Sequence, residues 1–233
     1  MTSSILHPRR GHTHTIIWLH DRNTFAVEFF VKLFDCEAPQ PEGLPIALPD
    51  LFPTVKWVFP QAPLLRADQS NIENMSQWFD LWSTGNPRAR PELQEPGLRS
   101  SITQIMDLIR REPLPSHKIF LAGFGQGFAT ALSAFLTAGG LQFAGLIGLS
   151  SWLPPFAERH LHTSMYPVTD ETPVFLAHSV DDRVVSISNG KLLRDTLRIH
   201  MGSVEWNKYT KGGHWINEDQ GIDDIVTFLR ANM

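Results

Sequence analysis

The feature that most constrains the fold is a set of closely spaced glycines near the middle of the 233-residue chain. Before them, residues 117–122 form an apolar run that is typical of a buried strand. After them, residues 126–138 form an alanine-rich run that is typical of a helix. Glycine adopts backbone angles that are closed to other residues. Gly123, Gly125 and Gly127 therefore predict a sharp strand–turn–helix connection.

The rest of the chain alternates between strand-like and helix-like segments. Residues 61–95 and 151–171 show little periodicity and are predicted to be irregular, as long functional loops often are. The alternation predicts an α/β fold in one domain, residues 1–233, with a mostly parallel central sheet and helices on both faces. The further predicted strands are residues 13–19, 54–59, 143–149, 173–178 and 204–209, and the further predicted helices are residues 25–34, 98–111, 190–200 and 219–230.

Composition excludes several classes of protein. The chain is 42% hydrophobic and 19% charged, which is typical of a globular protein. Its net charge of -4 argues against nucleic acid as a partner. With Cys36 as the single cysteine, no internal disulfide can form and a reducing compartment is indicated. The chain has neither a signal-peptide pattern nor an apolar run long enough for a membrane span, so we expect a cytoplasmic protein.

The residues that could carry chemistry follow predicted strands at one edge of the sheet. They are His20, Gly125, the segment 179–182, and His214. Ligands of such sheets bind beyond the carboxyl ends of the strands. The sequence therefore predicts a single site at this edge.

The order of these residues matches that of a hydrolase triad. Residues 123–127 fit the nucleophile-elbow pattern G-x-S-x-G, except that Gly125 stands in the place of the serine. An acid and then a histidine follow along the chain. An imidazole needs a carboxylate to orient it and to stabilise its charged form. We predict that Asp182 serves His214 in this way; Asp181 is the competing choice, and the spacing to Val185 favours Asp182.

Several motifs in register resemble the phospholipase/carboxylesterase family, which includes the acyl-protein thioesterases. The resemblance implies a compact α/β-hydrolase fold, no cofactor or metal, and a small apolar or acyl-bearing substrate, in a monomer or homodimer. It assigns Asp182 and His214 as acid and base, and the backbone N–H groups of Arg22 and Gln126 as the oxyanion hole. Residues 212–218 resemble fungal members. The motifs lie at residues 12–20, 57–60, 78–80, 123–127, 178–185 and 213–214.

Two residues depart from the family pattern on this edge. Gly125 has no hydroxyl, so no acyl-enzyme can form on it. Asp21 stands where the family has glycine, in the loop that completes the oxyanion hole. A carboxylate there would repel a developing oxyanion unless it turned away. It could equally be a solvent-facing loop residue, because aspartate is common in turns.

Three functions are compatible with this pattern. In the first, the chain catalyses proton transfer, isomerisation or cyclisation of a small apolar metabolite, with His214 oriented by Asp182 and possible help from Asp21. In the second, it is a serine esterase or thioesterase whose nucleophile has been replaced by Gly125. In the third, it binds a small molecule without chemistry. The side chains predicted to line the pocket are His20, Phe124, Trp78, Trp152 and Trp215.

Overall fold

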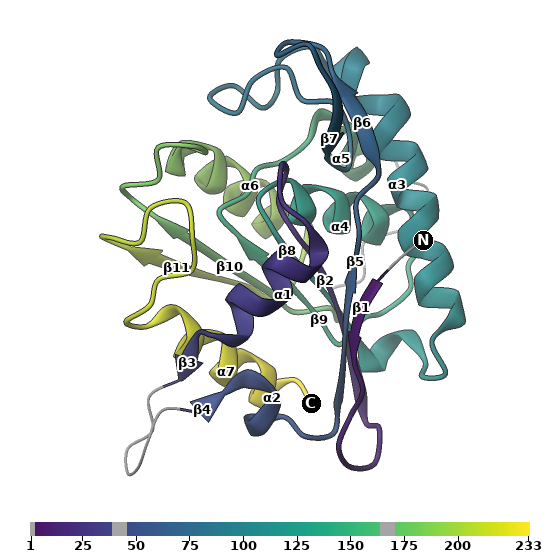
Figure 1. The fold of residues 1–233 in the computed structure, drawn as a ribbon, viewed down its shortest axis with the longest axis vertical. Helices are drawn as coiled ribbons and strands as arrows, with labels where there is room; N and C mark the ends of the chain where they lie inside the picture. Colours follow the sequence, from purple (N-terminus) through teal and green to yellow (C-terminus); the bar gives the residue numbers. More distant parts are fainter. Residues whose placement is uncertain (1–2, 39–45, 164–170) are drawn as a thin grey trace.

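A seven-stranded sheet forms the centre of the computed structural model, which describes residues 3–38, 46–163 and 171–233 (Figure 1). All neighbouring strands pair in parallel except β1, which is antiparallel to β5. This confirms the predicted α/β class and its mostly parallel sheet. In order across the sheet, the strands are β1 (Ser3–Leu6), β5 (Val55–Pro60), β2 (His14–Leu19), β8 (Ile119–Phe124), β9 (Gly145–Leu149), β10 (Val174–Ser179) and β11 (Val204–Tyr209).

Helices cover both faces of the sheet, and each face has its own apolar core. Successive residues of a strand point to opposite faces. In β2, Ile17 and Leu19 therefore join one core, and Ile16 and Trp18 join the other. The first core also contains side chains of α3 (Pro91–Arg111), α4 (Gln126–Thr137), α5 (Pro155–Thr163) and α6 (Ile187–His200); the second contains side chains of α1 (Ala26–Phe34), α2 (Leu48–Leu51) and α7 (Gly221–Ala231).

Two segments that were predicted to be irregular contain regular structure. Residues 61–95 include an antiparallel hairpin of β6 (Leu64–Ala67) and β7 (Ile72–Ser76), and also the start of α3. That helix begins at Pro91 and not at residue 98, so Pro96 lies inside it. The segment 151–171 contains α5, whereas its residues 164–170 lie outside the described residues.

Several further short elements were not predicted, the helix α2 among them. Strand β1 forms at residues 3–6, ahead of the first predicted strand. Strands β3 (Glu37–Ala38) and β4 (Ile46–Ala47) pair antiparallel, and a short 3-10 helix, η1 (Ser116–Lys118), precedes β8. None of the helices in the described parts of the chain is long and apolar enough to cross a membrane.

The predicted sharp connection lies between β8 and α4. Gly125 has a φ of 53° and a ψ of -120°, a conformation that glycine adopts at low cost. Its N–H donates to Leu149 O at 2.9 Å, and its own carbonyl accepts from Ser151 Oγ at 2.7 Å. Gly127 packs so closely on β2 that a Cβ there would lie 2.3 Å from Leu19 O. The turn therefore holds the N-terminus of α4 against the edge of the sheet.

Candidate active site

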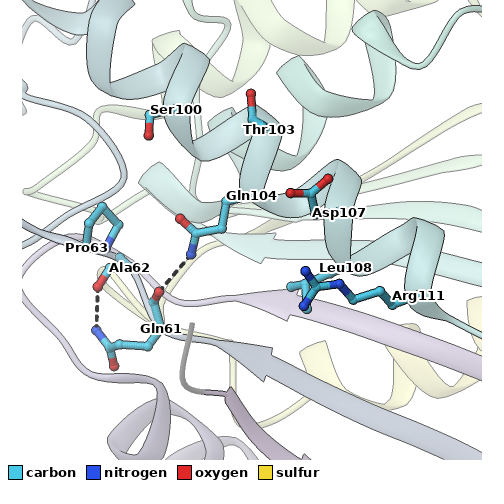
Figure 2. Close-up of a pocket in the computed structure, with 9 residues that line it drawn as sticks. All are labelled: Gln61, Ala62, Pro63, Ser100, Thr103, Gln104, Asp107, Leu108 and Arg111. Carbon is cyan, nitrogen blue, oxygen red and sulfur yellow. Dashed lines mark hydrogen bonds between the residues drawn. The ribbon is translucent and has the colours of Figure 1, made fainter.

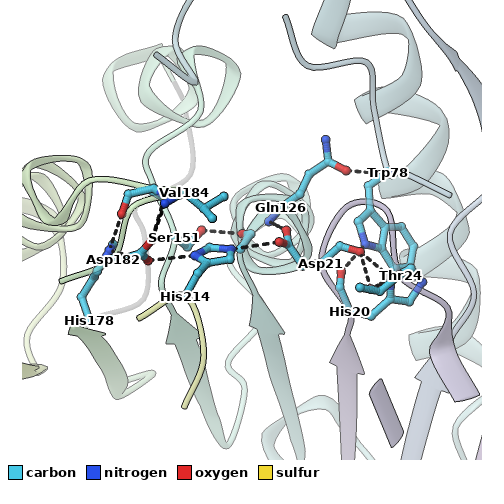
Figure 3. Close-up of polar contacts among 12 residues, drawn as sticks. His20, Asp21, Thr24, Trp78, Gln126, Ser151, His178, Asp182, Val184 and His214 are labelled. Carbon is cyan, nitrogen blue, oxygen red and sulfur yellow. Dashed lines mark hydrogen bonds and ion pairs between the residues drawn. The ribbon is translucent and has the colours of Figure 1, made fainter. Parts of the chain in front are cut away.

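A buried carboxylate and an imidazole meet at this edge (Figure 3). Asp182 lies in the turn after β10, and its Oδ2 is 2.8 Å from His214 Nδ1. Its Oδ1 accepts hydrogen bonds from the backbone N–H groups of Val184 and Val185, both at 2.9 Å. The Asp182 side chain is fully buried. Both oxygens of Asp182 are thus engaged, which fixes the orientation of the His214 ring.

Neighbouring residues support this pair. His178 Nε2 lies 3.2 Å from Asp182 Oδ2 and 2.9 Å from Val185 O. The competing acid, Asp181, accepts a hydrogen bond from Gly213 N–H at 2.8 Å. Asp181 therefore holds the loop that carries His214, and Asp182 contacts the ring itself.

The carboxylate of Asp21 points into the site, where it contacts the opposite side of the His214 ring (Figure 3). Its Oδ2 is 3.0 Å from His214 Nε2, and its Oδ1 accepts from Gln126 N–H at 2.7 Å. The Asp21 backbone is fixed as well, because its carbonyl accepts from Thr24 Oγ1 at 2.8 Å and from His20 Nδ1 at 2.7 Å. Asp21 is therefore neither a solvent-facing loop residue nor turned away from the site.

The space that Asp21 occupies is the space a side chain at residue 125 would need. A Cβ on Gly125 would lie 2.1 Å from Asp21 Oδ1 and 2.4 Å from Asp21 Cγ. Both distances are far below van der Waals contact. The Asp21 carboxylate in its observed position therefore excludes a serine side chain at residue 125.

The backbone N–H of Gln126, one of the two donors predicted for the oxyanion hole, has a partner in this structure. The N–H of Gln126, the first residue of α4, donates to Asp21 Oδ1. The Gln126 side chain accepts from Trp78 N–H at 2.9 Å and donates to Phe79 O at 2.8 Å. The Nε of Arg22 donates to Gln77 Oε1 at 2.9 Å. The predicted oxyanion donor of Gln126 thus binds a carboxylate of the chain itself.

Electrostatics make His214 a cation at neutral pH. Burial lowers the pKa of His214, but the hydrogen bonds to Asp182 and Asp21 and the charges of both carboxylates raise it to about 9. Burial raises the pKa of Asp182, yet the hydrogen bonds from His178 and His214 bring it well below its usual range. The imidazolium of His214 therefore lies between two carboxylates, those of Asp182 and Asp21.

A cavity of about 300 Å³ gives access to Asp21 and His214. The side chain of Asp21 is 18% exposed to solvent and that of His214 is 13% exposed, so a ligand in the cavity can reach both. The ring of Phe124 lies 4.9 Å from that of His214 and 5.2 Å from that of Trp215. The residues that line the cavity are Asp21, Thr24, Glu28, Phe29, Lys32, Phe124, His214 and Trp215.

The other side chains predicted to line the pocket lie elsewhere. Trp78 and Trp152 are buried in the core that contains α4, and neither lines this cavity. Trp78 Nε1 donates to His20 O at 2.8 Å, so Trp78 supports the Asp21 loop from behind. His20 is fully buried, and this burial lowers its pKa. His20 holds the backbone of Asp21 and does not line the cavity.

Sequence reasoning missed the side chains that α1 contributes to the cavity. Glu28, Phe29 and Lys32 lie on one helix face, at the three- and four-residue spacing that brings side chains together. Lys32 Nζ is 3.8 Å from the centre of a Trp215 ring, a cation–π contact. The spacing alone could have predicted the shared face, but nothing in the sequence pairs that face with Trp215.

Two larger cavities contain none of the three residues Asp182, His214 and Asp21. One, of about 550 Å³, is formed by α3 and residues 61–63, where Gln104 Nε2 donates to Gln61 O at 3.0 Å (Figure 2). The other, of about 600 Å³, shares Lys32 and Trp215 with the cavity beside Asp21 and His214 and extends toward Cys36 and Ile222. Among the residues that the structure describes, no group of three or more His, Cys, Asp or Glu is arranged to hold a metal ion.

Known proteins resemble the chain in both sequence and fold. The model of the phospholipase/carboxylesterase family matches residues 44–233. An acyl-protein thioesterase 1 of Yarrowia lipolytica is 26% identical over 231 residues, which cover 97% of this chain and 94% of the relative. An acyl-protein thioesterase 1 of Neurospora crassa is 33% identical over 183 residues, or 74% of this chain and 73% of the relative.

The fold is shared with a solved structure. The crystal structure of Zea mays acyl-protein thioesterase 2 aligns with a TM-score of 0.73 at 22% identity. The alignment covers 99% of this chain and 98% of that chain. The α/β-hydrolase fold implied by the sequence motifs is thereby confirmed.

Proposed function

This chain belongs to the phospholipase/carboxylesterase family, and we propose that it catalyses proton transfer by acid–base chemistry at Asp21 and His214. The chain is an α/β-hydrolase of the acyl-protein thioesterase and carboxylesterase type. Gly125 supplies no hydroxyl for an acyl-enzyme. The proposed chemistry therefore replaces the serine-centred step of an esterase or thioesterase.

The observation that carries the proposal is the ion pair between Asp21 and His214 at the cavity. A carboxylate oxygen able to accept a proton lies 3.0 Å from an imidazolium nitrogen able to donate one. A substrate that lies across the two groups can lose a proton to Asp21 at one atom and gain a proton from His214 at another. Such a pair contributes about 10²- to 10⁴-fold to a rate.

The cavity favours a small apolar substrate. Phe29, Phe124 and Trp215 supply aromatic walls beside the ion pair, in a volume of about 300 Å³. Net proton transfer between two atoms of one molecule gives isomerisation, and transfer coupled to bond formation within the molecule gives cyclisation. We propose these reaction types for a small apolar metabolite, in agreement with the prediction from sequence.

The proposal can be tested without knowing the natural substrate. Small apolar ketones are incubated with the protein in heavy water, and NMR follows the exchange of deuterium into the position next to the carbonyl. We expect exchange above the buffer rate, with a loss of about 100-fold or more in Asp21→Asn and His214→Gln. The matched control is Asp195→Asn, whose carboxylate is exposed and lies outside the cavity.

Two results would contradict the proposal. One is exchange that continues at the full rate in His214→Gln, because the imidazolium would then play no part. The other is the absence of exchange or turnover for every ketone that binds to the cavity. A ligand that binds and returns unaltered would instead favour the alternative of a small-molecule binding protein.

A further inference from the structure

We propose that His178 is a positioning residue, which shares the Oδ2 atom of Asp182 with His214 and so leaves the proton of His214 available at the cavity. The inference rests on the acid role proposed for His214, and it adds a residue that does not line the cavity. It is derived from three features: the tautomer of the His178 ring, the oxygen that this ring contacts, and the backbone donors that already hold Asp182.

The first feature is the tautomer of His178, a residue of β10. Its Nε2 lies 2.9 Å from Val185 O, and because a carbonyl oxygen can only accept a hydrogen bond, Nε2 carries a proton. The other ring nitrogen, Nδ1, is buried and has no hydrogen-bond partner among the described residues. Gly190 of α6 packs so closely that a Cβ there would lie 2.4 Å from Nδ1. A proton on Nδ1 would have no acceptor, so the ring donates from Nε2 alone.

The second feature is the oxygen that His178 contacts. Its Nε2 is 3.2 Å from Asp182 Oδ2, the same atom that lies 2.8 Å from His214 Nδ1 (Figure 3). The side chains of His178 and Asp182 are buried, and a hydrogen bond is electrostatically stronger there than in water. Among the described residues, Asp182 is the one charged group paired with His178. A single carboxylate oxygen therefore accepts from two imidazole rings.

The third feature is the support of Asp182 at its other oxygen. Oδ1 accepts from the backbone N–H groups of Val184 and Val185, both at 2.9 Å. These two bonds hold the carboxylate from the turn after β10, so its orientation does not depend on His178. The additional donor on Oδ2 therefore acts on the charge of Asp182 rather than on its position.

The donor on Oδ2 divides the negative charge of Asp182 between two rings. Burial raises the pKa of Asp182, but the hydrogen bonds from His178 and from His214 bring it below its usual range. With part of the charge on Oδ2 engaged by His178, Asp182 stabilises the imidazolium of His214 less strongly. His214 then gives a proton to a substrate from Nε2 more readily than it would if Asp182 contacted no second ring.

Two variants with side chains of similar length isolate this donor. Both lose the ring, but His178→Gln keeps an N–H group near the place of Nε2, whereas His178→Met has no donor. NMR titration of ¹⁵N-labelled protein measures the pKa of His214 in each. We expect a pKa of His214 that is higher in His178→Met than in His178→Gln by at least about half a unit, because Oδ2 regains charge. In His178→Gln it should stay close to the value of the unchanged protein.

Three results would overturn the inference. The same pKa of His214 in both variants would show that His178 only fills space. A lower pKa in His178→Met would show that His178 is needed to keep Asp182 against His214. The third is read from the unchanged protein and so does not depend on whether a variant folds: a His178 ring with its proton on Nδ1 could not donate from Nε2. None of these measurements uses a substrate, so failure of the proposed function is seen separately, in the deuterium exchange of ketones.

Discussion

His214 lies between two carboxylates, with Asp182 at its Nδ1 and Asp21 at its Nε2. An imidazole can donate from both nitrogens only when it is protonated. The geometry and the raised pKa of about 9 therefore describe the same state. Removing the charge of Asp21 should leave a ring that is still oriented by Asp182 but loses its proton more easily.

This state can be measured on the ring itself. We predict that NMR titration of ¹⁵N-labelled protein places the pKa of His214 near 9, and that Asp21→Asn lowers it. Asp181→Asn is the matched control, because Asp181 binds Gly213 N–H and not the ring. A His214 that titrates near the usual value of 6.5 in the unchanged protein would contradict the assignment of an imidazolium.

The sequence predicted the Asp182–His214 contact, whereas it left the orientation of the Asp21 carboxylate open. Both Asp182 and His214 follow strands that end at the same sheet edge, so their order along the chain was informative. The position of the Asp21 carboxylate depends on partners 105 and 193 residues away, and on the space left at Gly125. Trp78 and Trp152 show a second limit, since composition cannot distinguish an aromatic core from an aromatic pocket.

At the scale of elements, the contact between α4 and β2 fixes the site. Gly127, in the first turn of α4, approaches the end of β2, and Asp21 follows that strand. A Cβ at Gly127 would lie 2.3 Å from Leu19 O and 2.5 Å from His20 O, and neither backbone atom can move alone. The tight contact therefore couples the N-terminus of α4 to the loop that carries Asp21.

We predict that Gly127→Ala destabilises the protein by at least about 2 kcal/mol, because it overpacks this contact. Urea unfolding followed by circular dichroism measures the change. Gly11→Ala is the control, since a Cβ there meets nothing within 4 Å, and we expect a change within about 0.5 kcal/mol. Equal stability of the two variants would show that α4 and β2 are not coupled in this way.

The strands and helices with strong periodicity could be predicted, whereas weakly patterned elements could not. The run at residues 117–122 and the alanine-rich run after it correspond to β8 and α4. The start of α3 was missed because Pro96-Gly97 is a typical break signal. In the fold, Gly97 lies so close to Phe79 that a Cβ would be 2.9 Å from its Cα. Tertiary packing thus overrides the local preference.

At the scale of the whole molecule, two histidines make stability depend on pH in opposite directions. His214 has its pKa raised in the folded state, whereas burial and the nearby charge of Lys118 lower the pKa of His14 to about 4. A raised pKa stabilises the fold at low pH, and a lowered histidine pKa stabilises it at high pH. Together the two groups favour a stability maximum between their titration ranges.

We predict that the contribution of His214 is complete below pH 6.5 and is lost as the pH rises through about 9. The rise in the pKa of His214 corresponds to roughly 3 kcal/mol of folding free energy at most, because one pKa unit is about 1.4 kcal/mol. Thermal unfolding between neutral and alkaline pH measures the loss, and Asp21→Asn should reduce it. A loss of the same size in His214→Gln would assign the effect to other groups.

The contribution of His14 should appear on the acid side. Its neutral form is favoured in the fold, so stability should fall as the pH drops from 6.5 toward 4. Unfolding of His14→Gln across this range tests the assignment, because the variant lacks the titrating group. An unchanged acid slope in the variant would show that His14 does not contribute.

The exclusion of a side chain at residue 125 by the Asp21 carboxylate is tested most directly by ester hydrolysis in Gly125→Ser, Asp21→Gly and the double variant. In Gly125→Ser the new side chain collides with the Asp21 carboxylate, and that carboxylate still competes with the substrate oxyanion for Gln126 N–H. We predict that the double variant hydrolyses p-nitrophenyl butyrate at least roughly 100-fold faster than either single variant. If Gly125→Ser alone matches the double variant, Asp21 does not hold the place of the nucleophile.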